Sequence, residues 1–169
     1  RFFAGMGYPL GDSRVLPYEK MYSAGGPNDI RAWDSDELGP GSDTTKLPSY
    51  MYKAGDIKLE ANLEYRFKLF WVIEGAFFID AGNIWMYNPD EEKEGISTAF
   101  RWDQFYKEIA VGTGLGTRFD FSFLMIRFDF GIKMRDPAIL TGNKWIDLNQ
   151  ELDYGFKDWL SLKFGIGYP

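Results

Sequence analysis

Residues 56–68 alternate strictly between apolar and polar side chains, and no other feature constrains the fold as much. Apolar or small residues occupy every second position from Ile57 to Phe67, and polar residues occupy every second position from Lys58 to Lys68. An amphipathic helix would instead repeat its apolar residues at intervals of three and four. The alternation therefore predicts a long β-strand with one apolar and one charged face.

Five more segments of the chain alternate in the same way. Most of the six are about 9 to 15 residues long, which exceeds the ~5–6 residues of an ordinary strand and reaches the ~9–11 that cross a bilayer. A soluble sandwich rarely sustains alternation over such lengths. The five further predicted strands are residues 1–8, 71–85, 109–121, 123–135 and 160–168.

The connections between the predicted strands have two sizes. Two joins are tight, at Leu69-Phe70 and at Ser122, whereas residues 9–55, 86–108 and 136–159 form long connections. Short turns that alternate with long loops are typical of transmembrane barrels. We therefore predict an all-β fold, a transmembrane antiparallel β-barrel. Six strands are too few to close one, since bacterial barrels begin at eight, so we expect further strands from outside this sequence.

Composition excludes several classes of function. The 169 residues include no Cys and no His, which removes thiolate metal sites, disulfides and every imidazole mechanism. The net charge is −6 without a basic run, so a nucleic-acid partner is not expected. We predict no enzyme activity, no catalytic residue, no metal and no cofactor.

The long first connection, about residues 10–55, carries the most distinctive motifs: Gly25-Gly26, then Ile30-Arg31-Ala32-Trp33, then Gly39-Pro40. This order resembles the sixth extracellular loop of the BamA/TamA family of outer-membrane assembly factors (bacterial surface antigens). Ala32 and Trp33 stand where the family pattern has Gly and an aromatic Phe or Tyr. That departure favours a TamA-like branch.

The resemblance continues to the end of the sequence. It implies that residues 1–169 are the carboxy-terminal part of the barrel domain, the last six strands of a sixteen-strand barrel, with periplasmic repeat domains upstream. The segments that resemble the family's later strands are residues 61–67, 78–85, 112–116, 128–131 and 164–169.

The resemblance also implies a site. In the family the loop folds back into the lumen and its arginine pairs with lumenal acids, which places Arg31 against Glu64 and Asp80. The alternation agrees, because Glu64 lies on the charged parity of its strand, and Asp80 lies on the same parity as Glu74. The forked guanidinium of arginine suits two carboxylates.

The function implied by the resemblance is insertion or folding of outer-membrane β-barrel proteins, or translocation of surface proteins, in the bacterial outer membrane. A weakly closed seam would accept a client strand by β-augmentation. The partners would be nascent outer-membrane proteins, the lipid bilayer, and accessory lipoproteins or an inner-membrane or periplasmic partner. The alternative is a passive porin or a two-partner-type secretion channel. The predicted seam residues are Leu162, Phe164, Gly165, Ile166, Gly167 and Tyr168.

Two further motifs have simpler interpretations. Asp34, Asp36 and Glu37 lack the residue order of a calcium loop, so we expect a solvated acidic loop. Gly112, with Gly114 and Gly116, alternates within a strand and precedes no helix, so it is not a phosphate cradle. We expect these small residues to leave room in the lumen for the folded-in loop, or to permit strong coiling of the strand.

Overall fold

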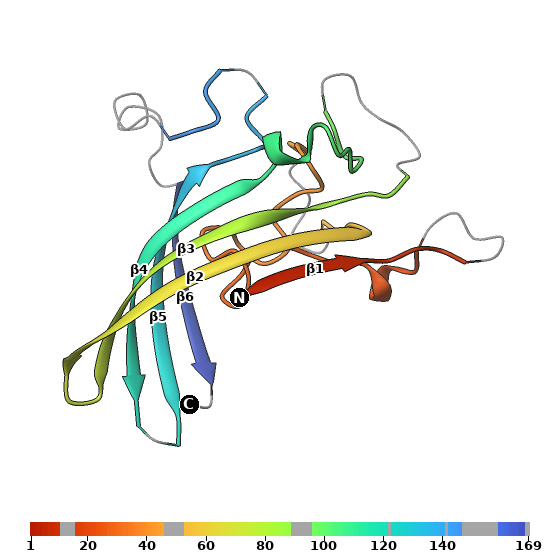
Figure 1. Cartoon of the computed structure of the whole chain (residues 1–169). Coiled ribbons are helices and arrows are strands. Elements are labelled where there is room, and N and C mark those ends of the chain that lie inside the picture. Colours follow the sequence, from red (N-terminus) through yellow and green to blue (C-terminus); the bar gives the residue numbers. More distant parts are fainter. Residues whose placement is uncertain are drawn as a thin grey trace.

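The fold is a single antiparallel sheet in which every strand pairs with its neighbours in sequence (Figure 1). The computed structural model describes residues 1–10, 16–45, 53–88, 96–121, 123–140, 142–146 and 159–167. Those ranges contain six strands and two single-turn 3-10 helices, and the all-β prediction is confirmed. The elements are β1 (Phe2–Met6), η1 (Tyr18–Lys20), β2 (Ile57–Phe70), β3 (Ile73–Trp85), η2 (Phe105–Lys107), β4 (Ala110–Asp120), β5 (Met125–Arg135) and β6 (Leu160–Gly167).

The second and third strands of the sheet are unusually long. β2 has 14 residues and β3 has 13, so each spans roughly 45 Å at the usual rise per residue. Their pairing runs from Ile57 opposite Trp85 to Phe70 opposite Ile73. No helix in the described ranges is long and apolar enough to span a membrane.

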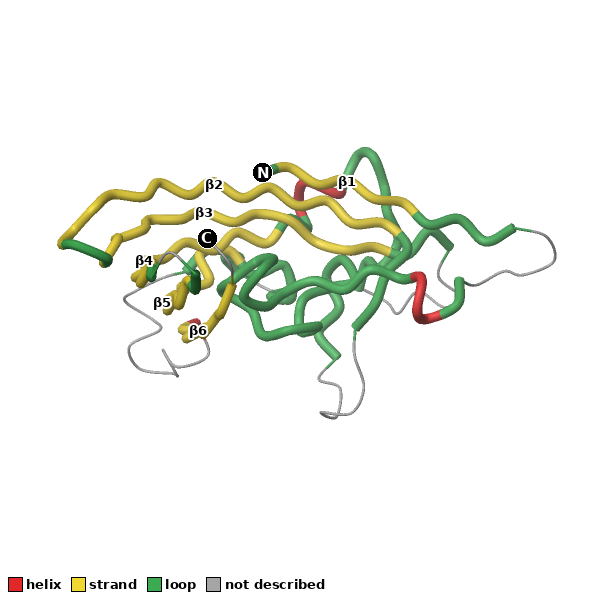
Figure 2. Tube along the Cα trace, turned by 90° about the horizontal axis from the view of Figure 1, so that it is seen from below, coloured by secondary structure: helices red, strands yellow, loops and turns green. Residues whose placement is uncertain are grey.

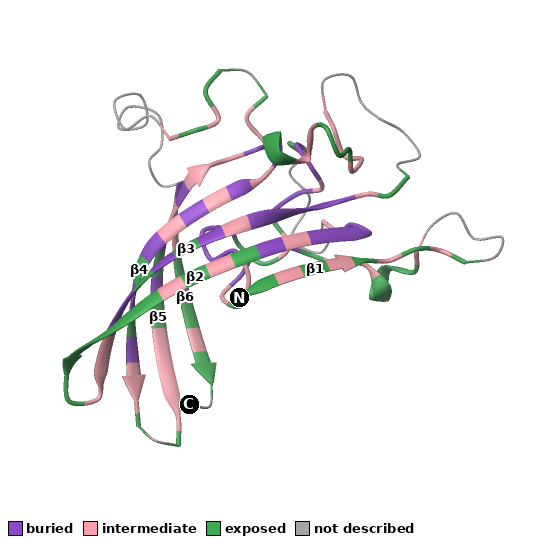
Figure 3. Ribbon diagram, viewed as in Figure 1, coloured by how far each residue is buried: buried purple, intermediate pink, exposed green. Residues whose placement is uncertain are grey.

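The sheet is curved, and its two faces differ as the alternation predicts. Figure 2 shows the strands curling around a loop that lies on the concave side. Large apolar side chains cover the convex face and are exposed, among them Leu63 at 71% and Leu115 at 61%. Charged side chains such as Glu60 and Asp129 are buried on the concave face. Figure 3 shows this change of burial along each strand.

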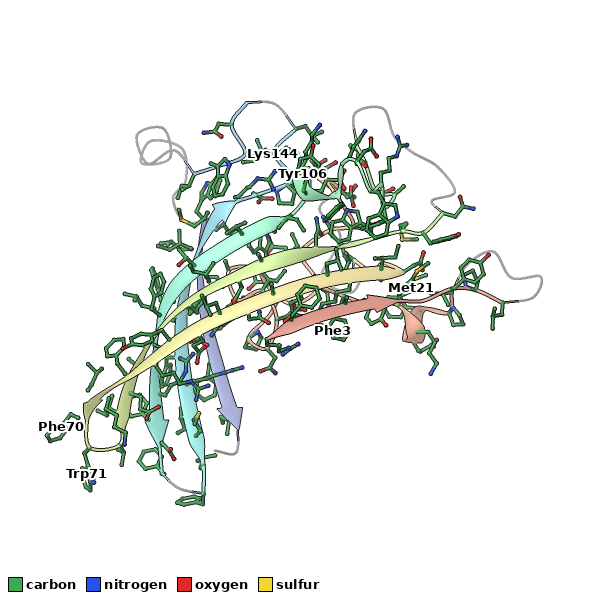
Figure 4. The ribbon with its side chains drawn as sticks, in the orientation of Figure 1. Phe3, Met21, Phe70, Trp71, Tyr106 and Lys144 are labelled. Atoms are coloured by element: carbon green, nitrogen blue, oxygen red, sulfur yellow. The ribbon has the colours of Figure 1, made fainter. Side chains whose placement is uncertain are left out.

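The tight turns lie at one end of the sheet and the long connections at the other (Figure 1). The predicted join at Leu69-Phe70 is wrong, because β2 continues to Phe70 and the turn is Trp71 with Val72. Leu69 is an extra residue at a bulge, and Trp71 takes a left-handed conformation with φ 48°, which tight two-residue hairpins require. Figure 4 shows Phe70 and Trp71 at this tip, far from Tyr106 and Lys144. Ser122 lies outside the described residues.

The apolar core is small and sits between the sheet and residues 21–45, which we call the inner loop. Ile30 and Ala32 are completely buried, and they pack with Ile84 of β3 and Ala110 of β4. The inner loop is thus held against the concave face of the sheet, which brings its side chains onto the charged faces of β2 to β6.

Candidate functional site at the inner loop

The inner loop is shaped by its glycine pair. Gly25 and Gly26 have φ values of +103° and +100°, and a Cβ at Gly25 would overlap the carbonyl oxygen of Asp34. The amide of Gly26 donates to the Trp33 carbonyl at 3.0 Å, and the amide of Trp33 donates to the Ile30 carbonyl at 3.1 Å. These contacts close residues 30–33 into a tight turn against the sheet.

Arg31, at the centre of this turn, donates to both acids that the sequence analysis paired with it. Its Nε and Nη2 each lie 2.8 Å from an oxygen of Asp80, and its backbone amide donates to Asp80 Oδ2 at 3.1 Å. Its Nη1 donates to Glu64 Oε2. The guanidinium carbon stacks over the ring of Phe78, 3.7 Å from the ring centroid. A bidentate fork with a cation–π contact fixes both the position and the orientation of the loop.

Glu64 joins Arg31 to a second buried ion pair. Glu64 Oε2 also accepts from Arg118 at 2.9 Å, and Arg118 Nη1 donates to Asp129 Oδ1 at 2.5 Å. Arg66 donates to the other Glu64 oxygen at 2.6 Å, from a half-exposed position. Arg118 and Asp129 were missed by the sequence analysis, although both occupy the charged parity of their strands.

Burial and neighbouring charges act in opposite directions on the pKa values of Arg31 and Asp29. Burial disfavours the charged form of Arg31, but the hydrogen bonds and charges of Asp80 and Glu64 outweigh it and raise its pKa above the ordinary value. Burial raises the pKa of Asp29 to about 6, against the opposing effect of Lys58. Arg31 is therefore charged at every working pH, whereas the charge of Asp29 falls in mildly acidic solution.

The other predicted loop residues fill the space around Arg31. Ala32 faces two glycines of the sheet. A Cβ added to Gly112 would lie 2.6 Å from the Cβ of Ala32, and a Cβ added to Gly131 would lie 3.1 Å from the Cα of Ala32. This geometry fits the expectation that Gly112 leaves room for the loop. Trp33 is buried, and the ammonium of Lys133 lies 5.4 Å from its ring centroid.

Gly39 and Pro40 end the turn beside β3. Gly39 has φ +83°, and an added Cβ would lie only 2.5 Å from Ile84 Cγ1. The next residue, Gly41, donates its amide to the Ile84 carbonyl at 2.7 Å, and Asn83 Nδ2 donates to the Gly41 carbonyl at 2.8 Å. Residues 39–41 are therefore hydrogen-bonded to the carboxy-terminal end of β3.

The acids of this loop are solvated as expected, since the side chains of Asp34 and Glu37 are 82% and 46% exposed, but each also has a lysine partner on the sheet. Glu37 accepts from Lys133 of β5 at 3.1 Å, and Asp34 pairs with Lys163 of β6. These pairs could not be predicted from the sequence, because their partners lie 96 and 129 residues apart in the chain. No cluster of three acids, His or Cys in a metal-binding arrangement occurs in the described part of the chain.

The predicted seam residues lie apart from Arg31, on the last strand. Leu162, Phe164 and Ile166 project from the convex face and are more than half exposed. Gly165 faces the concave side, where an added Cβ would meet the side chain of Arg127. Gly167 has open space around it, and Tyr168 lies outside the described residues.

A curved antiparallel sheet with an apolar convex face and an ion-paired loop on its concave face defines a segment of an outer-membrane β-barrel protein. Residues 1–167 match the Omp85 superfamily domain, and the chain belongs to that superfamily. No curated protein matches the sequence. Members of this superfamily are bacterial outer-membrane proteins, and they are non-enzymatic factors of protein assembly or translocation.

Replacing Arg31 with Ala is expected to lower the free energy of unfolding by about 3–5 kcal/mol, because it leaves Asp80 buried beside Glu64 without a cation. Urea unfolding in lipid vesicles, followed by tryptophan fluorescence, measures the change. Arg66→Ala is the matched control. Arg66 also pairs with Glu64, but it is half exposed, so its loss costs at most about 1 kcal/mol. Equal stability of Arg31→Ala and the wild type would contradict this account.

Replacing Gly112 with Ala is expected to destabilise the protein by about 1–3 kcal/mol, because the new methyl group collides with Ala32. Adding Ala32→Gly removes the colliding methyl group and should recover most of that loss. The same unfolding assay measures both variants. Additive effects of the two substitutions would show that the positions do not share one space.

Proposed function

We propose that the protein inserts and folds outer-membrane β-barrel proteins, or translocates surface proteins, by opening laterally along β6. In this proposal residues 1–169 are the carboxy-terminal part of the barrel domain and supply the last six strands of a sixteen-strand barrel. The observation that carries the proposal is the match of residues 1–167 to the Omp85 superfamily domain, whose members assemble or translocate outer-membrane proteins. Within the described ranges both end strands of the sheet have a single neighbour, β2 for β1 and β5 for β6, and the seam is assigned to β6 on its composition.

The composition of β6 suits a seam that opens. Its eight residues include Gly165 and Gly167, which weaken strand pairing because they add backbone entropy and pack no side chain. The unpaired amide and carbonyl groups of such an edge are a template for another strand. A client strand would add there by β-augmentation, with Leu162, Phe164 and Ile166 continuing the apolar face into lipid.

The partners follow from this mechanism. Nascent outer-membrane proteins would be the clients, the bilayer would contact the convex face, and accessory lipoproteins or an inner-membrane or periplasmic partner would bind elsewhere. The TamA-like branch is supported by Ala32, whose methyl group is accommodated by glycine at positions 112 and 131. Neither covalent chemistry nor a cofactor enters the mechanism.

The alternative is a porin or a two-partner-type secretion channel. A polar cavity of about 580 Å³ beside the inner loop favours it, because such a cavity could be part of a water-filled path. The loop itself argues against a wide pore, since its ion pairs hold it across the concave face. Single-channel recordings in planar bilayers separate the two: an assembly factor is expected to lack the large, steady conductance of a porin. The cavity is lined by Arg1, Pro27, Asn28, Asp29, Arg31, Asn62, Glu64, Arg66 and Arg127.

Cysteines at Leu162 and Phe164, labelled with a photoreactive maleimide, are expected to crosslink to a nascent outer-membrane client. The matched control is a cysteine at Leu115, which is equally exposed on the convex face but lies in β4, a strand paired along both sides. Client adducts at the β6 positions should exceed those at Leu115 severalfold. Equal yields at all three positions would refute a seam at β6.

A further inference from the structure

The last strand carries a single charged side chain, and its partner lies in the inner loop. Lys163 is the only ionisable residue of β6, and its side chain is only 8% exposed on the concave face. Its ammonium pairs with the carboxylate of Asp34. Among the described residues, this is the only ion pair or side-chain hydrogen bond between residues 21–45 and β6.

Lys163 reaches the loop although another acid stands opposite it in the sheet. Asp129 of β5 is the cross-strand neighbour of Lys163, and such neighbours usually pair. Asp129 is already held by Arg118 at 2.5 Å, with Arg127 at 3.9 Å on its other oxygen. Because Arg118 already pairs closely with Asp129, the ammonium of Lys163 pairs with Asp34 instead.

The backbone of Asp34 is held in place by the inner loop, whereas its side chain is 82% exposed and has Lys163 as its ion-pair partner. The backbone amide of Asp34 donates to Glu37 Oε2 at 2.8 Å, and its carbonyl oxygen fits against Gly25, where no Cβ could stand. Asp34 follows Arg31 by three residues, and Arg31 is fixed to β3 by the fork on Asp80. The loop therefore connects β3, in the middle of the sheet, to β6 at its end.

We propose that Asp34 and Lys163 are positioning residues that hold β6 against the inner loop and keep the seam closed until a client displaces them. This inference rests on the proposed function, because the opening of the barrel along β6 is part of that proposal. When the pair breaks, β6 keeps its backbone pairing with β5 and the ring contact of Phe164 with Phe128, and the two glycines make that pairing pliable. The ion pair thus sets how easily the seam yields.

Hydrogen–deuterium exchange of the β6 amides, on the complete protein in nanodiscs without client, tests the positioning role. Asp34→Asn and Lys163→Gln should each accelerate exchange of residues 160–167 about tenfold, since both release the same contact. The double variant should exchange no faster than the faster single variant. Lys163→Arg, which keeps the charge, should stay near the wild type and controls for loss of folding.

Lys133→Gln is the matched control, since Lys133 is a similarly buried lysine that pairs with a loop acid, but from β5. It should leave β6 exchange near the wild-type rate. Unchanged exchange in Asp34→Asn and Lys163→Gln, or equal acceleration by Lys133→Gln, would overturn the inference. The client crosslink at Leu162 is measured in parallel and should increase in Asp34→Asn. Accelerated exchange without any client adduct would uphold the positioning role and overturn the proposed function instead.

Discussion

The fork of Arg31 on Asp80 is the interaction on which the rest of the structure depends. Asp80 is fully buried in the middle of β3, and a buried carboxylate is unfavourable unless a cation and further donors satisfy it. That cation comes from a loop 49 residues earlier in the chain, and Asn62 adds a hydrogen bond at 3.2 Å. The concave face of the sheet is therefore electrostatically incomplete without the loop, and the loop gains its position from the sheet.

Shape reinforces this electrostatic contact. Ala32 can lie flat on the sheet because positions 112 and 131, which are diagonal to each other on β4 and β5, carry no side chain. Gly25 and Gly39, at the two sides of the turn, have backbone conformations that other residues rarely adopt. Gly25 and Gly39 thus bend the loop, whereas Gly112 and Gly131 make space for it on the sheet.

The sequence predicted the sheet well, because strict alternation specifies both the strands and their faces. It missed the turn at Trp71, because a bulge at Leu69 breaks the alternation where apolar residues are continuous. The contacts of Arg31 followed from the family resemblance and not from spacing, since alternation says which face a residue lies on but not which distant residue it meets. The same limit explains why Arg118 and Asp129 were not recognised, and why Asp34 and Glu37 were expected to face only solvent.

The order of charges in the inner loop explains why it adopts one position in a polar interior. Arg31 meets acids of β2 and β3, while the flanking acids meet lysines: Asp29 with Lys58, Glu37 with Lys133, and Asp34 with Lys163. A shift of the loop along the sheet would bring charges of like sign together. The charges therefore select one position of the loop more strongly than its small apolar contact does. Since one of these pairs lies on the terminal strand, the register of the loop and the closure of that strand are set by the same charges.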